Sequence, residues 1–313
     1  MIAIVTFTPN PAVDVSTSVE QIVPTNKLRC TPSRRDPGGG GINVARVVRR
    51  LGGEAIAIYP RGGATGQLLS QLIAQEKISS RVSEIADETR EDFSVQEGSS
   101  GKQYRFVLPG PVMTEQEWRM CLDCLKSCDI RPGFVVASGS LPRGVPDDFY
   151  ARAAQIAKSW NAKFVLDTSG PPLRVALEEG VYLCKPNLRE LADLVGVALD
   201  DEASWIRASS RLVDQGHAEI VALSLGHLGA LLSAPHLTLR AQPLPIMPVS
   251  SVGAGDSFLG AIVFGLAAGF ELDQAFRYAV AAGSSAVLNP GTELCHLEDV
   301  ARLAPTVVVT ALP

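Results

Sequence analysis

Residues Ser251–Ser257 read SVGAGDS and lead directly into an apolar run from Phe258 to Phe270. The run contains three glycines and is too short to span a bilayer, so it predicts a buried helix. Small residues ahead of a helix leave its first backbone N–H groups free to bind an anion. Beside a transferring phosphoryl group, Asp256 could accept the proton of an attacking hydroxyl. The alternative is that Asp256 only caps the helix.

A second glycine-rich stretch lies near the N-terminus. Pro37–Asn43 reads PGGGGIN and opens a helical pattern over Ile42–Leu51, which ends at Gly52 and Gly53. The glycines let the backbone approach a ligand closely, and Asn43 could bond sugar hydroxyls or merely start the helix. The stretch lacks the acidic residue of a dinucleotide-binding fingerprint, and the sequence has no Walker phosphate loop. A Rossmann dehydrogenase is therefore disfavoured.

Short apolar segments alternate with segments of helical spacing along most of the chain. The apolar segments of strand length are Ile2–Phe7, Ala55–Tyr59, Phe134–Ala137, Phe164–Leu166, Tyr182–Cys184 and Ile220–Ser224. The helical segments include Ile42–Leu51, Gly66–Glu76 and Asp147–Lys158. Buried strands separated by helices predict an α/β fold, with a doubly wound, mainly parallel sheet flanked by helices.

Two stretches break this alternation. Residues 12–36 have no helical period, and residues 91–108 read as a hairpin that turns at Gly98–Gly101. We expect these two insertions to form a small antiparallel β lid beside the main sheet. With no repeat or long linker in the sequence, residues 1–313 are expected to form a single domain.

Composition and charge exclude several classes of protein. The 313 residues are 46% hydrophobic and carry a formal net charge of −5, so the basic field of a nucleic-acid-binding protein is missing. Met1–Phe7 runs into an apolar stretch without a charged leader, which predicts a first strand rather than a signal peptide. We expect a cytoplasmic protein with neither nucleic-acid nor membrane partners.

The six cysteines are too sparse for a disulfide framework. Cys121, Cys124 and Cys128 would share one face of a helix. A zinc site is one interpretation, but no histidine or second CxxC supplies the remaining ligands. The alternative is a stripe of small apolar residues facing the core.

The two glycine-rich motifs, in this order, resemble the signatures of the ribokinase-like (PfkB) carbohydrate kinases. Further matching positions are Asn10, Asp14, Ser138–Pro142, Asp167, Lys185–Asn187, Glu190 and Ser224–Gly226. The resemblance covers nearly the whole chain and implies a ribokinase-like fold. Within the family the chain is most similar to the phosphosugar branch, and there to the minor bacterial ATP-dependent 6-phosphofructokinases. Ser250 and Ser251 stand where many members carry Asp-Thr, which disfavours simple ribokinase or adenosine kinase activity.

The resemblance implies a role for each matching position. Asp256 would be the general base, with Gly253, Ala254 and Gly255 as the anion hole. The sugar phosphate would be held by Asp14, Lys27, Gly39, Gly40, Asn43, Arg90, Arg105 and Ser140. ATP would contact Lys185, Asn187, Ser224 and Gly226, and Glu190 would position Mg²⁺. Ser250, Val252, Ala286, Asn289, Gly291 and Glu293 resemble the family's monovalent-cation site, for K⁺.

Each assignment has a simpler alternative, and so does the function. Asp14 could be a turn former, Glu190 an ordinary helix-start carboxylate, and Arg105 a solvated lid residue. The resemblance implies phosphorylation of fructose 6-phosphate by ATP, with tagatose 6-phosphate or fructose 1-phosphate as alternative substrates. A non-catalytic sugar-binding regulator is a third possibility, against which Asp256 and Asn187 with Glu190 argue. The branch usually dimerises, so a homodimer through the lid sheets is expected.

Overall fold

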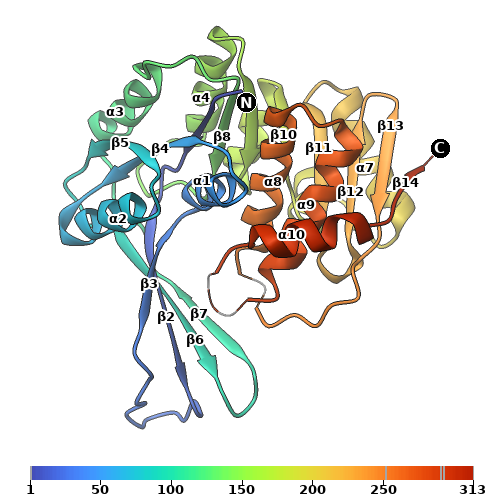
Figure 1. Cartoon of the computed structure of the whole chain (residues 1–313). Coiled ribbons are helices and arrows are strands. Elements are labelled where there is room, and N and C mark those ends of the chain that lie inside the picture. Colours follow the sequence, from blue (N-terminus) through green and yellow to red (C-terminus); the bar gives the residue numbers. More distant parts are fainter. Residues whose placement is uncertain (1, 251, 290, 292, 313) are drawn as a thin grey trace.

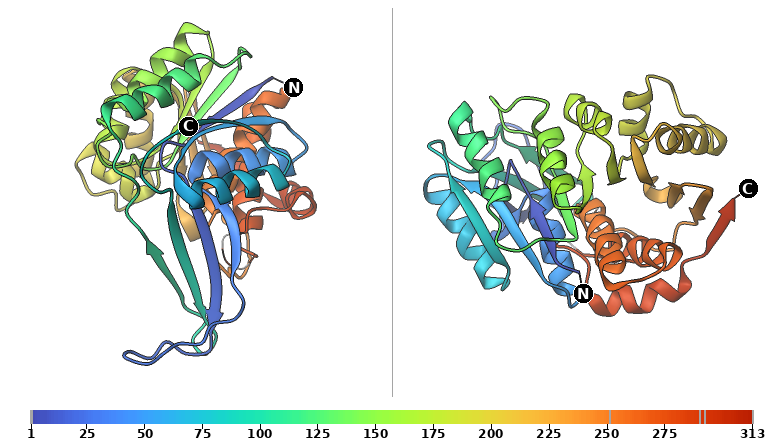
Figure 2. Two further views of the ribbon diagram at one scale, coloured as in Figure 1. Left: turned by 90° about the vertical axis from the view of Figure 1, so that its left-hand side faces the viewer. Right: turned by 90° about the horizontal axis from the view of Figure 1, so that it is seen from above.

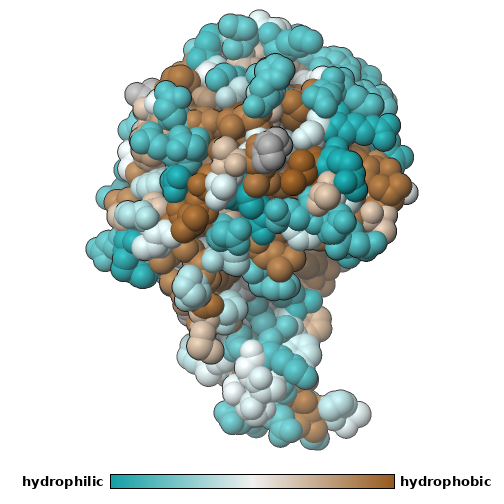
Figure 3. All heavy atoms as spheres, turned by 90° about the vertical axis from the view of Figure 1, so that its right-hand side faces the viewer, coloured by the Kyte–Doolittle hydropathy of each residue, from teal (hydrophilic) through white to brown (hydrophobic). Residues whose placement is uncertain are grey.

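The computed structural model describes residues 2–250, 252–289, 291 and 293–312. These residues form a broad α/β body from which a narrow arm of strands projects (Figure 1). Figure 3 shows the same arm below the body from the side of the C-terminal strands. Within this part of the chain, no helix has both the length and the apolar character needed to cross a bilayer.

A ten-stranded sheet runs through the described part of the body. Its strands, in spatial order, are β14 (Val309–Leu312), β13 (Leu237–Ala241), β12 (Ala230–Ala234), β11 (Ala218–Ser224), β10 (Val181–Cys184), β9 (Lys163–Asp167), β8 (Phe134–Ser138), β1 (Ile4–Phe7), β4 (Ala55–Arg61) and β5 (Ser79–Glu84). From β11 to β5 every pairing is parallel, and β12 to β14 add an antiparallel edge. The six predicted strands and the mainly parallel sheet are confirmed.

Helices cover both faces of this sheet, as the view from above shows (Figure 2). One face packs against α3 (Glu115–Lys126), α4 (Phe149–Ser159), α5 (Pro171–Glu178), α6 (Leu188–Val195) and α7 (Glu202–Asp214). The other packs against α1 (Gly40–Arg50), α8 (Ala254–Ala268), α9 (Leu272–Ala286) and α10 (Leu297–Leu303), while α2 (Gly63–Gln75) lies over β4 and the base of the arm. Cys121 and Cys128 are buried against the first face, but Cys128 lies beyond the end of α3, which corrects the expectation that the three cysteines share one helix face.

The predicted apolar helix is α8, and it is buried between two neighbouring helices. A Cβ on Gly260 would lie 2.6 Å from the side chain of Val47 on α1, and one on Gly265 would lie 3.1 Å from Ala275 on α9. The glycines therefore let three helices approach closely. This packing fixes the position of the α8 N-terminus relative to α1.

The arm is the predicted lid, a separate sheet in the order β3 (Arg34–Gly38), β2 (Ala12–Val19), β6 (Arg90–Glu97) and β7 (Gln103–Val107). The outer pairs β2/β3 and β6/β7 are antiparallel, as expected. The central pair β2/β6 is parallel, which corrects the expectation of an antiparallel lid throughout. The reason is that β2 and β6 follow the parallel strands β1 and β5, so both leave the same edge of the body in the same direction.

The carboxyl ends of the parallel strands meet at this edge. The helices α1 and α8 both begin here, and the lid is attached here (Figure 1). In open parallel sheets, ligands bind beyond the carboxyl ends of the strands. The fold therefore places a site between the lid and the two glycine-rich helix starts.

Candidate active site

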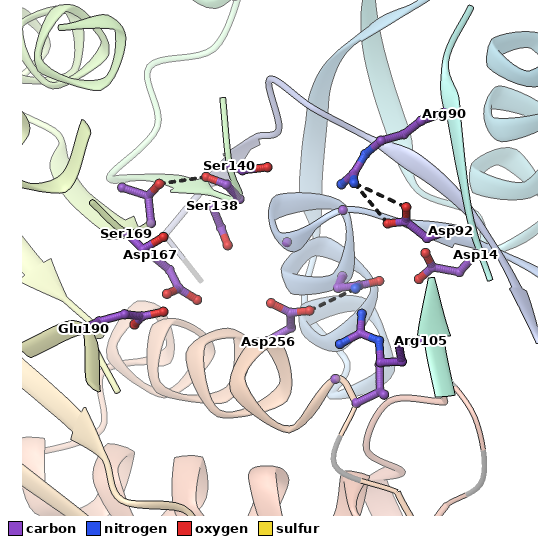
Figure 4. A pocket seen from close by; sticks show the side chains of 17 residues that line it. Asp14, Arg90, Asp92, Arg105, Ser138, Ser140, Asp167, Ser169, Glu190 and Asp256 are labelled. Carbon is purple, nitrogen blue, oxygen red and sulfur yellow. Dashed lines mark hydrogen bonds and ion pairs between the residues drawn. The ribbon is translucent and has the colours of Figure 1, made fainter. Parts of the chain in front are cut away.

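A cavity of about 310 Å³ lies at the junction of the lid and the body (Figure 4). It is lined by Asp14, Gly39, Gly40, Asn43, Arg90, Asp92, Arg105, Ser138, Gly139, Ser140, Asp167, Thr168, Ser169, Glu190, Val252, Gly253 and Asp256. Side chains from both sheets and both glycine-rich turns therefore converge on one space. Charged and polar side chains together make up most of the lining, which is typical of a site for polar, charged ligands.

The start of α8 forms one wall of the cavity. Gly253 precedes the helix with φ of 77°, a left-handed conformation that favours glycine, and no described side chain caps this end. The N–H groups of the first turn have no partners within the helix. Within 4 Å, a Cβ on Gly255 would meet, of the described residues, only Lys185, whose Nζ would lie 3.4 Å away. The turn therefore leaves room for an anion against its amides, although Ser251 lies outside the described residues.

Asp256 is on the first turn of α8, but it does not act as the helix cap. Its Oδ2 accepts a hydrogen bond of 2.9 Å from Asn43 Nδ2 on α1, across the interface of the two helices. Burial raises the pKa of Asp256, while the Asn43 hydrogen bond and the charges of Lys185, Arg105 and Arg46 lower it in part. The carboxylate is thus held by one oxygen and faces the cavity with the other.

The glycine-rich turn before α1 lies opposite. Gly39 has a φ of 104°, and a Cβ on Gly38 would lie 2.5 Å from the carboxyl carbon of Asp14. Asp14 is buried on β2, and its register partner across the lid sheet is Asp92 on β6. Burial, followed by the charge of Asp92, raises the pKa of Asp14 to about 7. Asp14 is therefore a buried strand residue that lines the cavity, and not the turn former that its sequence position allowed.

Two arginines from the lid strands line the cavity. Arg90 Nη1 lies 3.2 Å from Asp92 Oδ2, and Arg90 Nη2 donates to the carbonyl oxygen of Asn10 at 3.4 Å. Arg90 Nε is buried and has no hydrogen-bond partner among the described residues. Figure 4 shows Arg105 between Asp14 and Asp256. The Ser140 hydroxyl, which also lines the cavity, accepts a hydrogen bond of 3.2 Å from Asn10 Nδ2. This bond orients the Ser140 side chain.

Lys27 is the one predicted substrate residue that the structure does not bring to the cavity. It is exposed in the loop between β2 and β3, near the tip of the lid. Because the loop extends away from the body, Lys27 cannot contact a ligand in the cavity of its own chain in this conformation. Its role remains a prediction.

The predicted nucleotide residues lie beside the α8 wall. Lys185 is buried, and its Nζ lies 3.1 Å from Asp167 Oδ2. Burial alone would lower the pKa of Lys185, but the charge of Asp167 raises it, so the lysine stays charged. Ser224 is the last residue of β11 and Gly226 lies just after it, and neither lines the cavity. Ser224 pairs with Asn187 in an isolated β-bridge.

Asn187 and Glu190 form a capping box at the start of α6. The Asn187 side chain accepts from the Glu190 N–H, and the Glu190 carboxylate accepts from the Asn187 N–H, both at 2.9 Å. Burial raises the pKa of Glu190, and the Asn187 N–H opposes that shift. Glu190 therefore has the ordinary role of a helix-start carboxylate, and its side chain also lines the cavity.

The residues of the predicted monovalent-cation site gather in two adjoining loops. The Ser250 hydroxyl lies 2.9 Å from the carbonyl oxygen of Gly291, and Asn289 N–H donates to the Ala286 carbonyl at 3.2 Å. The Glu293 carboxylate is engaged by Arg34 at 3.2 Å and by His296 at 2.9 Å. Glu293 would therefore contribute a backbone oxygen rather than its carboxylate. Of this set, Val252 also lines the cavity.

Sequence reasoning missed several lining residues, namely Asp92, Ser138, Gly139, Asp167, Thr168 and Ser169. Ser138, Gly139 and Asp167 are motif positions to which the sequence analysis assigns no role. Thr168 and Ser169 had a usable signal, because they follow Asp167 at the end of a parallel strand, and the residues after such ends line sites in this kind of sheet. Asp92 could have been found as a second carboxylate beside Arg90.

Known proteins share this fold and sequence. Residues 10–299 match the sequence model of the family described as pfkB family carbohydrate kinase. The chain is 47% identical over 299 residues to ATP-dependent 6-phosphofructokinase isozyme 2 of Mycobacterium tuberculosis, covering 96% of this chain and 88% of that protein. It is 41% identical over 305 residues to the protein of the same name from Escherichia coli K12, covering 97% and 98%.

The solved structure of phosphofructokinase-2 from Escherichia coli in complex with potassium matches with a TM-score of 0.93 at 40% identity, covering 98% of this chain and 99% of that one. The sequence match, the fold and the two glycine-rich helix starts thus agree over nearly the whole length. The chain belongs to the pfkB family of carbohydrate kinases.

Proposed function

We propose that this kinase transfers the terminal phosphoryl group of ATP to fructose 6-phosphate, giving fructose 1,6-bisphosphate. The observation that carries the proposal is the polarity of the cavity. Asp256 and the α8 amides lie at one end and Arg90 of the lid lies at the other, with Arg105 between Asp14 and Asp256. A substrate that already carries a phosphate matches this layout, because its anion and its reacting hydroxyl lie at opposite ends.

The lid end would hold the phosphate already present on the sugar. Guanidinium groups bind phosphate through paired, charge-assisted hydrogen bonds. The buried Nε of Arg90, without a partner among the described residues, supports a ligand that accepts hydrogen bonds there. Asp14, Asn43 and the amides of the Gly39–Gly40 turn would meet the sugar hydroxyls between the two ends.

The α8 end would carry out the transfer. Asp256 would take the proton of the attacking hydroxyl on the oxygen that Asn43 leaves free. The first-turn N–H groups and Lys185 would stabilise the negative charge on the transferring group. The space above Gly255 supports this, because a side chain there would occupy the place of the anion.

Two cations fit the residues present. Carboxylate oxygens suit Mg²⁺, and Asp167 and Glu190 both present carboxylates to the cavity, so they would hold hydrated Mg²⁺ on ATP. Bound Mg²⁺ neutralises phosphate charge during the transfer. The backbone oxygens near Ser250 and Gly291 would suit K⁺, the ion present in the related potassium complex.

We also propose that the lid sheets pair two chains into a homodimer. Phe93 and Phe106 are register partners on β6 and β7, and they are exposed by 36% and 54%. Val107 and Leu108 extend this surface and are 59% and 42% exposed. Sedimentation should give a dimer for the wild type and a monomer for Phe106→Asp. A wild type that sediments as a monomer would end this part of the proposal.

The substrate is tested by ADP release with fructose 6-phosphate, fructose, tagatose 6-phosphate and fructose 1-phosphate. Losing two charge-assisted hydrogen bonds of about 1.5–3 kcal/mol each predicts at least a hundredfold lower kcat/KM for fructose. Arg90→Ala should abolish most of that preference, whereas the exposed Arg119→Ala should not. Equal use of fructose and fructose 6-phosphate by the wild type would refute the phosphosugar assignment.

A further inference from the structure

Arg46 is a buried cation that nothing in the sequence distinguishes from the other arginines of α1. Only 1% of the residue is exposed. A charge in such a position is costly unless it is fully paired, and here every arm of the guanidinium has a partner. Nε and Nη2 contact Glu76 Oε1 at 2.7 and 2.6 Å, and Nη2 lies 3.6 Å from Asp36 Oδ1.

The remaining arm of Arg46 reaches the active site. Nη1 donates to the carbonyl oxygen of Pro37, in the glycine-rich turn, at 2.9 Å and to Asn43 Oδ1 at 3.1 Å. A guanidinium has five donors and no acceptor, so it can face only the oxygen of the Asn43 amide. This contact turns the amide nitrogen toward Asp256, where it donates to Oδ2 at 2.9 Å.

The direction of the Asn43 amide matters for Asp256. With the amide reversed, its oxygen would face the carboxylate oxygen, and two acceptors would meet without a hydrogen. The carboxylate would then lose the bond that holds one of its oxygens and leaves the other facing the cavity. A general base must be held within hydrogen-bond reach of the proton that it takes.

We propose that Arg46 is a positioning residue for phosphoryl transfer, which acts by fixing the Asn43 amide so that Asp256 is held in its reactive orientation. The inference rests on the proposed function, in which Asp256 is the base. Arg46 also joins this pair to the lid, because Asp36 and Pro37 belong to β3. The base, the sugar-binding turn and the lid strand thus share one buried cation.

The chain offers a matched control in Arg240, a second buried arginine, which lies on β13 and is not among the residues that line the cavity. It lies 2.9 Å from Glu202 and donates to the carbonyl oxygens of Ala230, Leu228 and Ala241. Arg240→Met removes a comparable buried network without touching Asn43. Because Leu228 is close in the chain to Gly226, a predicted ATP contact, the two variants are compared at saturating Mg-ATP. Both Arg46→Met and Arg240→Met should lower the melting temperature, but only the first should lower kcat at saturating Mg-ATP or move the Asp256 titration.

The first measurement is a double-mutant cycle on kcat, with fructose 6-phosphate and Mg-ATP as substrates. Arg46→Met should lower kcat about tenfold or more, within the range for a misplaced general base. In an Asn43→Ala background it should have little further effect, because neighbours that act through one another are not additive. Full multiplication of the two effects would overturn the proposal, as would a wild-type kcat for Arg46→Met.

The second measurement follows the ionisation of the Asp256 carboxyl by ¹³C NMR in the free protein and needs no turnover. The charged or titratable groups around it are Arg46 on α1, Lys185 after β10, Arg105 on β7, Asp167 on β9 and Asp14 on β2. Loss of the Asn43 hydrogen bond and of the Arg46 charge both raise the pKa of Asp256. The titration of Arg46→Met, and the acidic limb of its rate profile, should therefore move to higher pH, while Arg240→Met stays at the wild-type position.

The two measurements separate the failure of this inference from failure of the proposed function. If the wild type does not phosphorylate fructose 6-phosphate, the proposed substrate is refuted. The shift of the Asp256 titration in Arg46→Met would still report the link from Arg46 to Asp256. An unchanged titration in Arg46→Met would refute the link whatever the substrate. If Arg46→Met does not fold, Arg46→Lys keeps a cation for Glu76 but lacks the planar fork, and it should move the titration in the same direction.

Discussion

The two glycine-rich helix starts look alike in the sequence but differ in what surrounds them. At the start of α1, a Cβ on Gly40 would lie 2.1 Å from Ser138 Oγ, and one on Gly41 would lie 2.5 Å from Thr8 Oγ1. At the start of α8, a Cβ on Gly255 would come within 4 Å of only Lys185 among the described residues, at a distance of 3.4 Å. The first turn is filled by the protein itself, whereas the second is open at Gly255.

This difference indicates two separate reasons for glycine. Before α1, glycine is required because the helix packs directly on the ends of β1 and β8. Before α8, Gly253 is required by its φ of 77° and by the Leu294 side chain, 2.8 Å from its Cβ position, whereas at Gly255 the protein leaves space for what binds there. Substitution of Gly41 in the first turn should therefore affect folding, and substitution of Gly255 in the second should affect catalysis.

The largest effect on kcat is expected at Asp256, the proposed base on the first turn of α8. Asp256→Asn keeps the shape and can still bond Asn43, but it cannot take a proton. Loss of a general base lowers kcat by roughly 10²–10⁴-fold. Calorimetry should find binding of ATP and fructose 6-phosphate nearly unchanged. A variant that retains half of the wild-type kcat would show that Asp256 is not the base.

Gly41→Ala tests the filled turn. Its Cβ would lie 2.5 Å from Thr8 Oγ1 and 2.9 Å from the carbonyl oxygen of Phe7, and backbone cannot move aside cheaply. Overpacking of this kind destabilises by about 1–3 kcal/mol, which denaturant unfolding would measure. A free energy of unfolding equal to that of the wild type would contradict the packing argument.

Gly255→Ala tests the open turn and should show the opposite pattern. Its free energy of unfolding should stay within about 0.5 kcal/mol of the wild type, because the methyl group meets only a flexible lysine end. The turnover should fall about tenfold or more, because the methyl group occupies the place of the transferring phosphoryl group. If Gly255→Ala loses stability while turnover is kept, the contrast between the two turns fails.

The smallest effect is expected at Glu190, beside the open turn. Glu190→Gln keeps the acceptor for the Asn187 N–H, so the capping box and the stability should survive. An amide attracts hydrated Mg²⁺ less than a carboxylate does, so more Mg²⁺ should be needed for half-maximal rate and kcat should fall a few-fold. A magnesium titration that matches the wild type would leave Glu190 with its helix-start role alone.

The sequence by itself determined the strands of the parallel sheet, the buried α8 helix and both glycine-rich turns. These features are local, since periodicity and turn residues are read within a few positions of one another. The motif order also located Asp256, Asn43 and most of the residues that line the cavity. Burial on both faces follows from continuous apolar runs, so the mainly parallel sheet could be predicted as well.

Only the tertiary structure decided how these local features meet. The hydrogen bond from Asn43 to Asp256 joins residues 213 positions apart, and no spacing rule connects them. The parallel pairing of β2 with β6 depends on which edge of the body both strands leave. Arg46 in a helix reads as a solvated residue until Glu76 and Asn43 are brought against it. Local patterns reflect backbone preference and burial, whereas pairing of distant polar groups exists only after the chain has packed.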